Sequence, residues 1–449
     1  MLSIAKLFAG NEEYYLRLCR YYAKGRGEPP GVWGGGLARL FGLFGFVTEK
    51  DLRAFMRGFR PGDPPPGDSG VALVQNAGKD GRIDAFDFTF TADKDVSVSW
   101  AISDSADRPI LERCHDEAVT EAMQWVEDQF CWCRTGSGGT GMRVKAEIAY
   151  SRFQHCMNRA GEPNLHDHVV MPNVGVDEFG VTRALDGYEL LCAKLDVGAY
   201  YRAALAAKLR KYAKIETELA EVGFRIKGFP EAVRVGESSR SREIEAIASE
   251  RGFDSAESKA VIAKETRGKK TIEEREAFFE RTRNRIESQY GFTAKDVQKL
   301  SRTFNWKPNE KSKRALIAAA EIRLLDNRNH FTKRQARIQV LQLGVANQMT
   351  PGQLLKLLKD FLAASHVVEL EGERFTTKGV IKQEAELLTL AESLTEGQGL
   401  YVSDEVIHRH LAATPADEMP DEEQLAAIKY LLQANTRIRI LNGFAGTGK

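Results

Sequence analysis

Three of the chain's eight histidines lie close together in the sequence, at His155, His166 and His168. Neutral imidazole rings are common ligands of Zn²⁺ and other divalent metals, and a set of three leaves positions on the metal open for a substrate. Spacing alone does not separate zinc, manganese, magnesium and iron. The residue types therefore indicate metal-assisted chemistry, and histidines that merely pack in a core or lie on the surface are the simpler alternative.

A β-hairpin would bring these histidines to one place. Residues 145–153 and 165–174 are typical of strands, and the segment between them contains the turn residues Gly and Pro. Because side chains alternate between the two faces of a strand, His166 and His168 point the same way. A hairpin turn can then place His155 across from them.

Four tyrosines near the N-terminus could supply a nucleophile. Tyr14 and Tyr21 are seven residues apart, as are Tyr15 and Tyr22. Seven residues are nearly two turns of the helix expected at 11–27, so each pair shares one stripe. A phenol oxygen is a competent nucleophile when a base removes its proton or a metal stabilises the developing charge. An aromatic stripe facing the core is the alternative, and the spacing does not choose among the four.

An aspartate on a predicted strand could assist either group. In the stretch at 84–91, phenylalanines face one side and Asp87 faces the other with two threonines. A carboxylate there could orient a metal-bound histidine or take the proton of a tyrosine. A solvated strand aspartate is the alternative.

Taken in order, these features resemble the MobF conjugative relaxases, the TrwC/TraI type of HUH nuclease. The matching stretches are MLSIAKL at the start, the two tyrosine pairs, GVWGGGLARLFGL at 31–43, DFTFTADKDVSVS at 87–99, FQH and LHDHVV around the three histidines, and RALDG at 183–187. Each match is short, but their order along the chain makes the set specific.

The resemblance implies an α+β fold, with an antiparallel sheet and packed helices in an HUH relaxase domain over residues 1–300. It implies strand-specific nicking and rejoining of single-stranded DNA at a transfer origin, in conjugative plasmid transfer. Tyr14 would attack a phosphodiester and form a 5′-phosphotyrosyl link, and Tyr21 would perform a second cleavage. Tyr15 and Tyr22 would support them. The three histidines would hold a divalent metal, Mg²⁺ or Mn²⁺, with Zn²⁺ as a further candidate.

The expected partners follow from this resemblance. They are single-stranded DNA, accessory DNA-binding proteins and the coupling protein of a type IV secretion system. The net charge is only +1, so any DNA-binding surface must be local, and the basic stretch at 267–270 is one candidate. The six cysteines show no Cys-x-x-Cys spacing, which is typical of reduced, mostly buried thiols. The sequence has no secretory signal or transmembrane segment, which favours the bacterial cytoplasm.

The last third of the chain predicts further units. The polar stretch at 301–313 is expected to be a linker. Helices followed by a strand–turn–strand pattern predict a winged-helix-like segment over 314–390, a unit that binds nucleic acid in some proteins and protein partners in others. Residues 391–449 resemble the beginning of a RecD-like superfamily-1 helicase domain, with an apolar strand expected at 438–441.

This last segment contains nucleotide-binding motifs. Gly443, Gly446, Gly448 and Lys449 belong to a P-loop sequence, whose backbone N–H groups and lysine bind phosphates. Gln424 matches the adenine-reading Q motif of those helicases. The chain stops at Lys449, before the Ser/Thr that holds Mg²⁺. We therefore expect the N-terminal fragment of a longer relaxase–helicase, with ATP bound only by the full-length protein.

Three other functions compete with this interpretation. A rolling-circle replication initiator of the HUH class shares the metal and tyrosine chemistry. A non-catalytic DNA-binding module that loads a helicase would use the histidines structurally. A three-histidine hydrolase or oxygenase would leave the tyrosine pairs and the P-loop unexplained.

Overall fold

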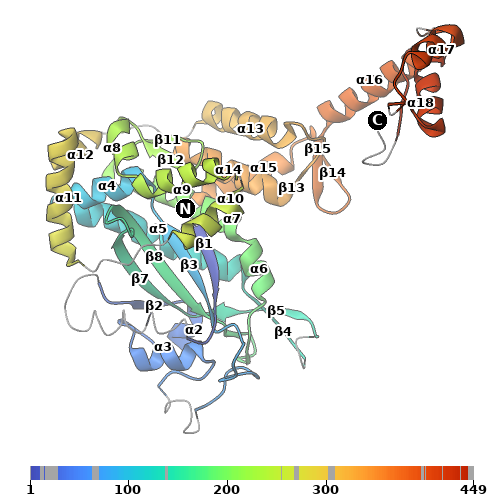
Figure 1. Cartoon of the computed structure of the whole chain (residues 1–449). Helices are drawn as coiled ribbons and strands as arrows, with labels where there is room; N and C mark the ends of the chain where they lie inside the picture. The colour runs from blue at the N-terminus through green and yellow to red at the C-terminus, as the bar shows by residue number, and fades with distance from the viewer. Residues whose placement is uncertain are drawn as a thin grey trace. The chain divides into compact units, whose positions relative to one another are not determined.

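The computed structural model consists of two compact units, formed by Met1–Asp326 with Lys333–Phe361 and by Asn327–Thr332 with Leu362–Lys449 (Figure 1). The structure describes residues 2–10, 15, 29–62, 70–136, 140–253, 255–266, 273–301, 309–395, 399, 401–416, 418–434 and 436–442.

A five-stranded antiparallel sheet forms the centre of the first unit, in the order β1-β3-β8-β7-β2. Its strands are β1 (Leu2–Leu7), β2 (Val32–Gly34), β3 (Ala85–Thr91), β7 (Tyr150–Met157) and β8 (Pro163–Pro172). The strands expected from the sequence in this unit are present, and the hairpin of two histidine-bearing strands is β7–β8. β8 pairs with β3 on one side and with β7 on the other, so it lies in the middle of the sheet.

The phenylalanine side of β3 is the side covered by helices. Phe86, Phe88 and Phe90 are fully buried. The ring of Phe90 lies 5.2 Å from that of Tyr201 in α7 (Lys194–Lys208). α7 in turn packs against α5 (Arg108–Phe130), and α4 (Lys94–Ile102) contacts β8 (Figure 1). The α+β class and the antiparallel sheet expected from the sequence are confirmed. Asp87 and Thr89 lie on the opposite face of β3.

Further helices and strands surround the sheet. They are α2 (Gly36–Leu40), α3 (Glu49–Met56), β4 (Trp132–Arg134), β5 (Arg143–Lys145), β6 (Glu147–Ile148), β9 (Gly175–Val176), β10 (Thr182–Arg183), α6 (Gly187–Cys192), a π-helical turn at Leu209–Ala213, β11 (Thr217–Leu219), β12 (Phe224–Ile226), α8 (Glu231–Gly236), α11 (Arg275–Tyr290) and α12 (Ala294–Leu300).

One helix expected from the charge pattern is two helices. The sequence favours a single helix at 243–264, whereas the structure has α9 (Ser239–Glu250) and α10 (Ala256–Glu265). The break contains Gly252 with a φ of 67°. This left-handed conformation suits glycine and is a common end of a helix.

A group of three helices after residue 309 belongs to the first unit. α13 (Glu310–Leu325) begins inside the stretch expected as a linker, because the Asn309 side chain accepts a hydrogen bond from the Ser312 backbone N–H and caps the helix. α14 (Lys333–Asn347) and α15 (Pro351–Leu362) follow.

Buried polar contacts join α14 to the sheet-covering helix α7. Nε atoms of Arg334 and Arg337 lie 2.6 and 2.9 Å from the buried carboxylate of Asp196. Just beyond α14, the Gln348 side chain donates to the backbone oxygens of Ala206 and Ile215. Because Asp196 and Gln348 are buried, these partners satisfy polar groups that water cannot reach, and α14 is fixed on α7.

The second unit contains a three-stranded sheet in the order β13-β15-β14, made of β13 (Phe331–Thr332), β14 (Val367–Leu370) and β15 (Arg374–Thr377). It continues with α16 (Lys378–Thr395), α17 (Asp404–Ala412) and α18 (Glu422–Gln433). The expected strand–turn–strand is therefore present. The strand expected at 438–441 is not, since those residues form no regular element. Within the described parts of the chain, no helix has the length and apolar character needed to cross a membrane.

Candidate metal and tyrosine site

The β7–β8 hairpin brings the three histidines together. His155 and His166 are direct partners in the antiparallel register, and His168 lies two residues further along β8 on the same face. The ring centres of His155, His166 and His168 are 5.2, 5.3 and 5.4 Å apart in the three pairs. His155 is buried and the other two are half-buried, so the cluster has one side that a substrate can reach.

The chemistry and spacing of this cluster fit a divalent cation. A metal–nitrogen bond of about 2.1 Å puts an ion about 3.2 Å from an imidazole centre, so three rings at tetrahedral angles have centres about 5 Å apart. Among the described residues, no group of three or more His, Cys, Asp and Glu side chains is arranged so that it could hold a metal ion as the structure stands. Small rotations of the three rings would converge their nitrogens, because the ring centres already have the separation that a shared ion requires.

Hydrogen bonds to Nδ1 select the nitrogen that each ring can offer. Nδ1 of His166 lies 2.7 Å from the backbone oxygen of Asn164. Nδ1 of His168 lies 2.9 Å from Oδ2 of Asp87. The Asp87 carboxylate favours a proton on Nδ1 of His168, which leaves the Nε2 lone pair of that ring as the metal ligand. The closer contact of His166 favours the same tautomer, whereas the side-chain nitrogen of Asn164, 3.0 Å from the same Nδ1, is a donor that favours the other one.

Asp87 connects the histidines to a tyrosine. The carboxylate is 6% exposed, so it is not a solvated strand aspartate. It accepts a hydrogen bond of 2.8 Å from the Tyr15 hydroxyl, in addition to its contact with His168. The Thr89 hydroxyl lies 3.4 Å from the same carboxylate. The neighbouring β3 and β8 strands position this contact, since Thr89 is the register partner of His168.

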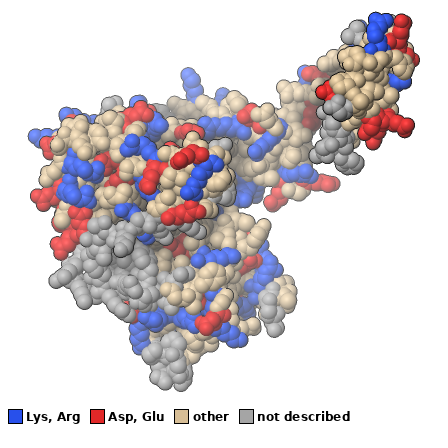
Figure 2. Space-filling model, viewed as in Figure 1, with Lys and Arg blue, Asp and Glu red and all other residues tan. Residues whose placement is uncertain are grey.

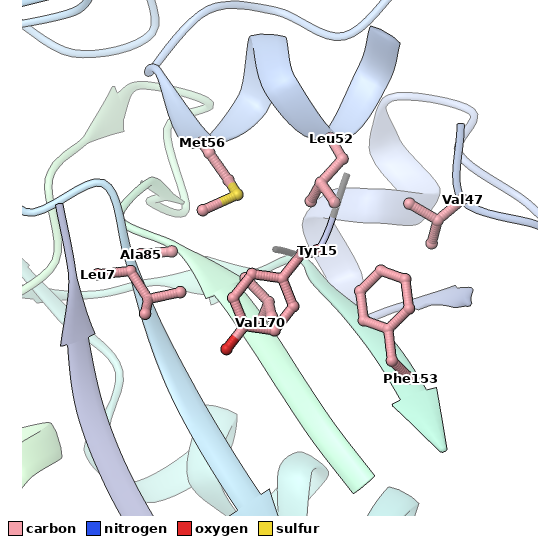
Figure 3. Packing of buried hydrophobic residues seen from close by; sticks show 8 residues of the cluster. All are labelled: Leu7, Tyr15, Val47, Leu52, Met56, Ala85, Phe153 and Val170. Carbon is pink, nitrogen blue, oxygen red and sulfur yellow. The ribbon is translucent and has the colours of Figure 1, made fainter. Parts of the chain in front are cut away.

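The Tyr15 ring is part of the hydrophobic core and is 4% exposed. Figure 3 shows the ring between α3 and the strands, packed with Leu7, Val47, Leu52, Met56, Ala85, Phe153 and Val170. Its centre is 6.0 Å from that of His168, in an edge-on arrangement. The helix expected at 11–27 and its other tyrosines, Tyr14, Tyr21 and Tyr22, lie outside the described residues.

A buried ionic network on the other face of β8 was not predicted from the sequence. Asp167, between two of the histidines, is fully buried and forms an ion pair with Arg152. Nε2 of His115 lies 3.2 Å from Asp167, and Nδ1 of His115 lies 2.7 Å from the Tyr201 hydroxyl. Strand alternation predicts that Asp167 faces away from the histidines, but its partners come from distant elements. His115 packs in the core and does not join the metal cluster.

The electrostatics of this network keep Asp167 ionised. Burial by itself raises the pKa of the Asp167 carboxyl, but the charges of Arg152 and then His115 lower that pKa further than burial raises it, to well below its usual range. Arg152 also forms an ion pair with Asp116 of α5. β8 is therefore anchored from behind, which limits the movement of the histidines at its front.

A half-buried lysine stabilises the turn of the hairpin. Nζ of Lys94 donates a 2.9 Å hydrogen bond to the backbone oxygen of Pro163 and lies 3.9 Å from Glu162. Burial lowers the pKa of Lys94, although the charge of Glu162 opposes that effect. Glu162 also accepts from the Asn158 side chain at 2.7 Å. The hairpin that carries the histidines is thus closed by polar contacts at its turn.

The nucleotide-binding motifs are only partly described. Gln424 lies in the first turn of α18, where its side chain accepts from the Asp421 backbone N–H in a capping box. The P-loop residues Gly443, Gly446, Gly448 and Lys449 lie outside the described residues, as does the basic stretch at 267–270.

The antiparallel sheet, the three histidines on its central hairpin and the neighbouring aspartate define an HUH nuclease domain. The sequence profile of the TrwC relaxases matches residues 8–289, which is more than half of the chain. The chain therefore belongs to the TrwC relaxase family.

Individual relatives agree with this assignment. The multifunctional conjugation protein TraI of Escherichia coli K12 is 28% identical over 179 residues, 39% of this chain and 9% of TraI. A second Escherichia coli TraI is 27% identical over 173 residues. The match thus spans only 9% of the length of these two relatives.

Solved structures of the relaxase TrwC in complex with oriT DNA resemble the chain. The copper-bound complex has 25% identity and a TM-score of 0.54, and covers 64% of this chain and 98% of that one. The metal-free complex has 26% identity and a TM-score of 0.53, with the same coverage.

Proposed function

We propose that this chain is a DNA relaxase that nicks and rejoins one strand of DNA at a transfer origin, with a divalent metal and a tyrosine nucleophile, in conjugative plasmid transfer. The observation that carries the proposal is the contact of Asp87 with both His168 and the hydroxyl of Tyr15. This contact joins the metal-ligand cluster to Tyr15, which follows Tyr14 in the sequence and is the one of the four tyrosines that lies within the described residues. The TraI relatives and the TrwC complexes with oriT DNA support the same activity.

The proposed reaction is a transesterification. The Tyr14 phenol oxygen attacks the scissile phosphorus, the bond from phosphorus to the 3′ oxygen breaks, and a 5′-phosphotyrosyl link forms. The phenol proton passes to Asp87, and the 3′ oxygen takes up a proton to become the free 3′-OH. Rejoining is the reverse attack by a 3′-OH and needs no ATP, because the phosphotyrosyl bond conserves the ester.

His155, His166 and His168 would hold the metal, with Mg²⁺ or Mn²⁺ as the first candidates and Zn²⁺ as another. A divalent ion there supplies Lewis-acid polarisation of the scissile phosphate. All three ligands are neutral, so the cation's full charge remains available to the phosphate oxygens. Asp87 and the Asn164 carbonyl orient two of the rings through Nδ1.

The four tyrosines receive different roles in this proposal. Tyr14 is the first nucleophile and Tyr21 performs the second cleavage, both by resemblance to the family. Tyr15 supports the site, because its ring is held in the core and its hydroxyl orients the Asp87 carboxylate. Tyr22 has the corresponding supporting role beside Tyr21.

The wider assignments are part of the same proposal. The partners are single-stranded DNA, accessory DNA-binding proteins and a type IV secretion coupling protein, in the bacterial cytoplasm. Residues 314–390 form a winged-helix-like segment in this proposal, although its first three helices belong to the first compact unit and its three-stranded sheet to the second. Residues 391–449 begin a RecD-like helicase domain, in which Gln424 and the P-loop would bind ATP.

The test is the covalent adduct. The chain is incubated with labelled single-stranded DNA containing the transfer origin of its host element, with Mg²⁺ or Mn²⁺, and in parallel with EDTA. We expect an SDS-resistant protein–DNA adduct that requires metal and disappears in Tyr14→Phe, a loss of at least about a thousandfold. Binding of the correct site without any adduct would refute the relaxase assignment in favour of a non-catalytic helicase loader.

A further inference from the structure

An open groove lies in the first unit, away from the histidine cluster. It is lined by the end of α7 and the π-helical turn after it, by the start of α13, and by the loop and first turns of α15. Its volume is about 1080 Å³. α14 is fixed on α7 by the pairing of Arg334 and Arg337 with the buried carboxylate of Asp196, so this groove is a built feature of the unit.

The groove carries an excess of positive charge. Six cationic side chains line it against three acidic ones, whereas the whole chain has a net charge of only +1. The cations are Lys208, Arg210, Lys211, Lys214, Lys313 and Lys356. Because opposite charges balance almost completely over the whole chain, this excess is local. Figure 2 shows the same balance, with lysine and arginine interspersed among acidic residues over the visible face.

Only part of this charge is neutralised within the protein. Lys208 pairs with Glu121 at 3.0 Å, and Lys313 pairs with Glu310 at 2.7 Å. Within the described residues, Lys211, Lys214 and Lys356 have no carboxylate within ion-pairing distance. Lys211 and Lys356 are exposed side chains that line the groove from two different elements, the π-helical turn and α15. An anion entering the groove would therefore meet lysines from both elements.

The backbone beside these lysines is strained. Lys214 has a φ of 57° and Gln348 a φ of 47°, and both line the groove. Lys214 ends the π-helical turn Leu209–Ala213. Left-handed non-glycine residues and π-helical turns cost free energy, and they are found preferentially at functional sites. Here the Gln348 side chain holds the conformation through its bond to the Ile215 oxygen.

We propose that this groove binds the sugar–phosphate backbone of single-stranded DNA outside the nick site. Lysine ammonium groups bind phosphates as point charges, and an open, basic channel suits an extended polyanion better than a small ligand. The inference rests on the proposed function, which supplies the strand. Contacts to phosphates carry no sequence information, so the groove would hold any sequence that extends from the nick.

The experiment measures binding of fluorescent oligo-dT to the full chain by anisotropy, in EDTA so that no strand is cut. The test variant combines Lys211→Glu with Lys356→Glu. The control combines Lys333→Glu with Lys359→Glu, which makes the same charge change at exposed lysines of α14 and α15 that do not line the groove. Circular dichroism verifies that both variants are folded.

We expect the groove variant to lose at least about tenfold in affinity. The slope of the logarithm of its binding constant against the logarithm of the salt concentration should become shallower by about 0.7 for each phosphate that the variant no longer neutralises. The control should stay within about twofold of the wild type. Equal losses in the two variants, or none in the groove variant, would overturn the proposal. If the groove variant binds DNA as tightly as the wild type, the result would indicate an acidic protein partner as the occupant of the groove instead.

Adduct formation separates this inference from the proposed function. On an oligonucleotide that ends just beyond the nick, the groove variant should form adduct at the wild-type rate. If the wild type forms no adduct while the groove variant still loses oligo-dT affinity, the relaxase proposal fails and the groove assignment stands. If the groove variant forms adduct but binds oligo-dT like the wild type, the groove assignment fails and the relaxase proposal stands.

Discussion

Oδ2 of Asp87 lies 2.9 Å from Nδ1 of His168, across the pairing of β3 with β8. The carboxylate thereby fixes the tautomer and the orientation of a ring that would otherwise rotate about its side-chain bonds. It also accepts the Tyr15 hydroxyl. A single buried carboxylate thus connects the metal-ligand cluster to the tyrosine-bearing segment.

Asp87→Asn should weaken metal binding and slow adduct formation. The amide has the same size but no charge, so it holds the His168 proton less well, and removal of such a partner costs about 10- to 100-fold in metal affinity. Isothermal titration with Mn²⁺ measures the affinity, and the SDS-resistant adduct measures the chemistry. Asp177→Asn, at a buried carboxylate paired with Arg183, is the matched control and should leave both unchanged. Unaltered Mn²⁺ affinity in Asp87→Asn would show that this carboxylate does not orient the ligand.

Tyr15→Phe should slow adduct formation without abolishing it. The change removes one hydrogen bond to a charged acceptor, which is worth about 1.5–3 kcal/mol, or about 10- to 150-fold in rate if it is fully expressed in the transition state. The ring keeps its place in the core, so the free energy of unfolding should fall by no more than this one hydrogen bond contributes, about 1.5–3 kcal/mol. Single-turnover kinetics of Tyr14→Phe and Tyr15→Phe distinguish their roles. Adduct formed by Tyr14→Phe but not by Tyr15→Phe would reverse the assignment and make Tyr15 the nucleophile.

Arg152→Ala should destabilise the first unit by about 3–5 kcal/mol, because it leaves the Asp167 carboxylate buried without its main partner. Thermal or urea unfolding measures the loss of stability. Arg251→Ala is the control, since Arg251 and Glu265 form an exposed pair at 2.8 Å, and such pairs contribute about 0–1 kcal/mol. Similar losses in the two variants would mean that the network behind β8 does not anchor the strand.

The buried cysteines should react slowly with alkylating reagents. Burial raises the pKa of Cys114 and of Cys133 to about 12, so only about 10⁻⁴ of either thiol is thiolate at pH 8. Among the five cysteines that the structure describes, iodoacetamide labelling at pH 8 with peptide mapping should therefore modify half-buried Cys192 first. A pKa above its usual value means that the thiolate fraction, and with it the labelling rate, should increase as pH rises toward 12. Urea-unfolded protein, in which all thiols react at pH 8, is the control.

The fold class followed from sequence patterns that are local. The alternation in 84–91 and the apolar run after His168 predicted β3 and β8, because a strand's period of two depends only on neighbouring residues. The break between α9 and α10 was missed, since a charged helix pattern continues across Gly252 and the left-handed φ is a property of the folded backbone. The strand expected at 438–441 rested on an apolar run alone, which does not form a strand without a partner to pair with.

The sequence by itself determined the chemical groups of the site. The His-x-His pair, the turn before it and the earlier His155 were enough to predict that three rings share one face of a hairpin. Tertiary structure decided which carboxylate serves them, because the contact between Asp87 and His168 depends on the register of strands 81 residues apart. It also decided that Arg152 and His115 secure the back of β8, and that lysines from α7, the π-helical turn and α15 face one groove. Sequence periodicity assigns a side chain to a face of its own element, whereas its neighbours across space depend on how the elements pack.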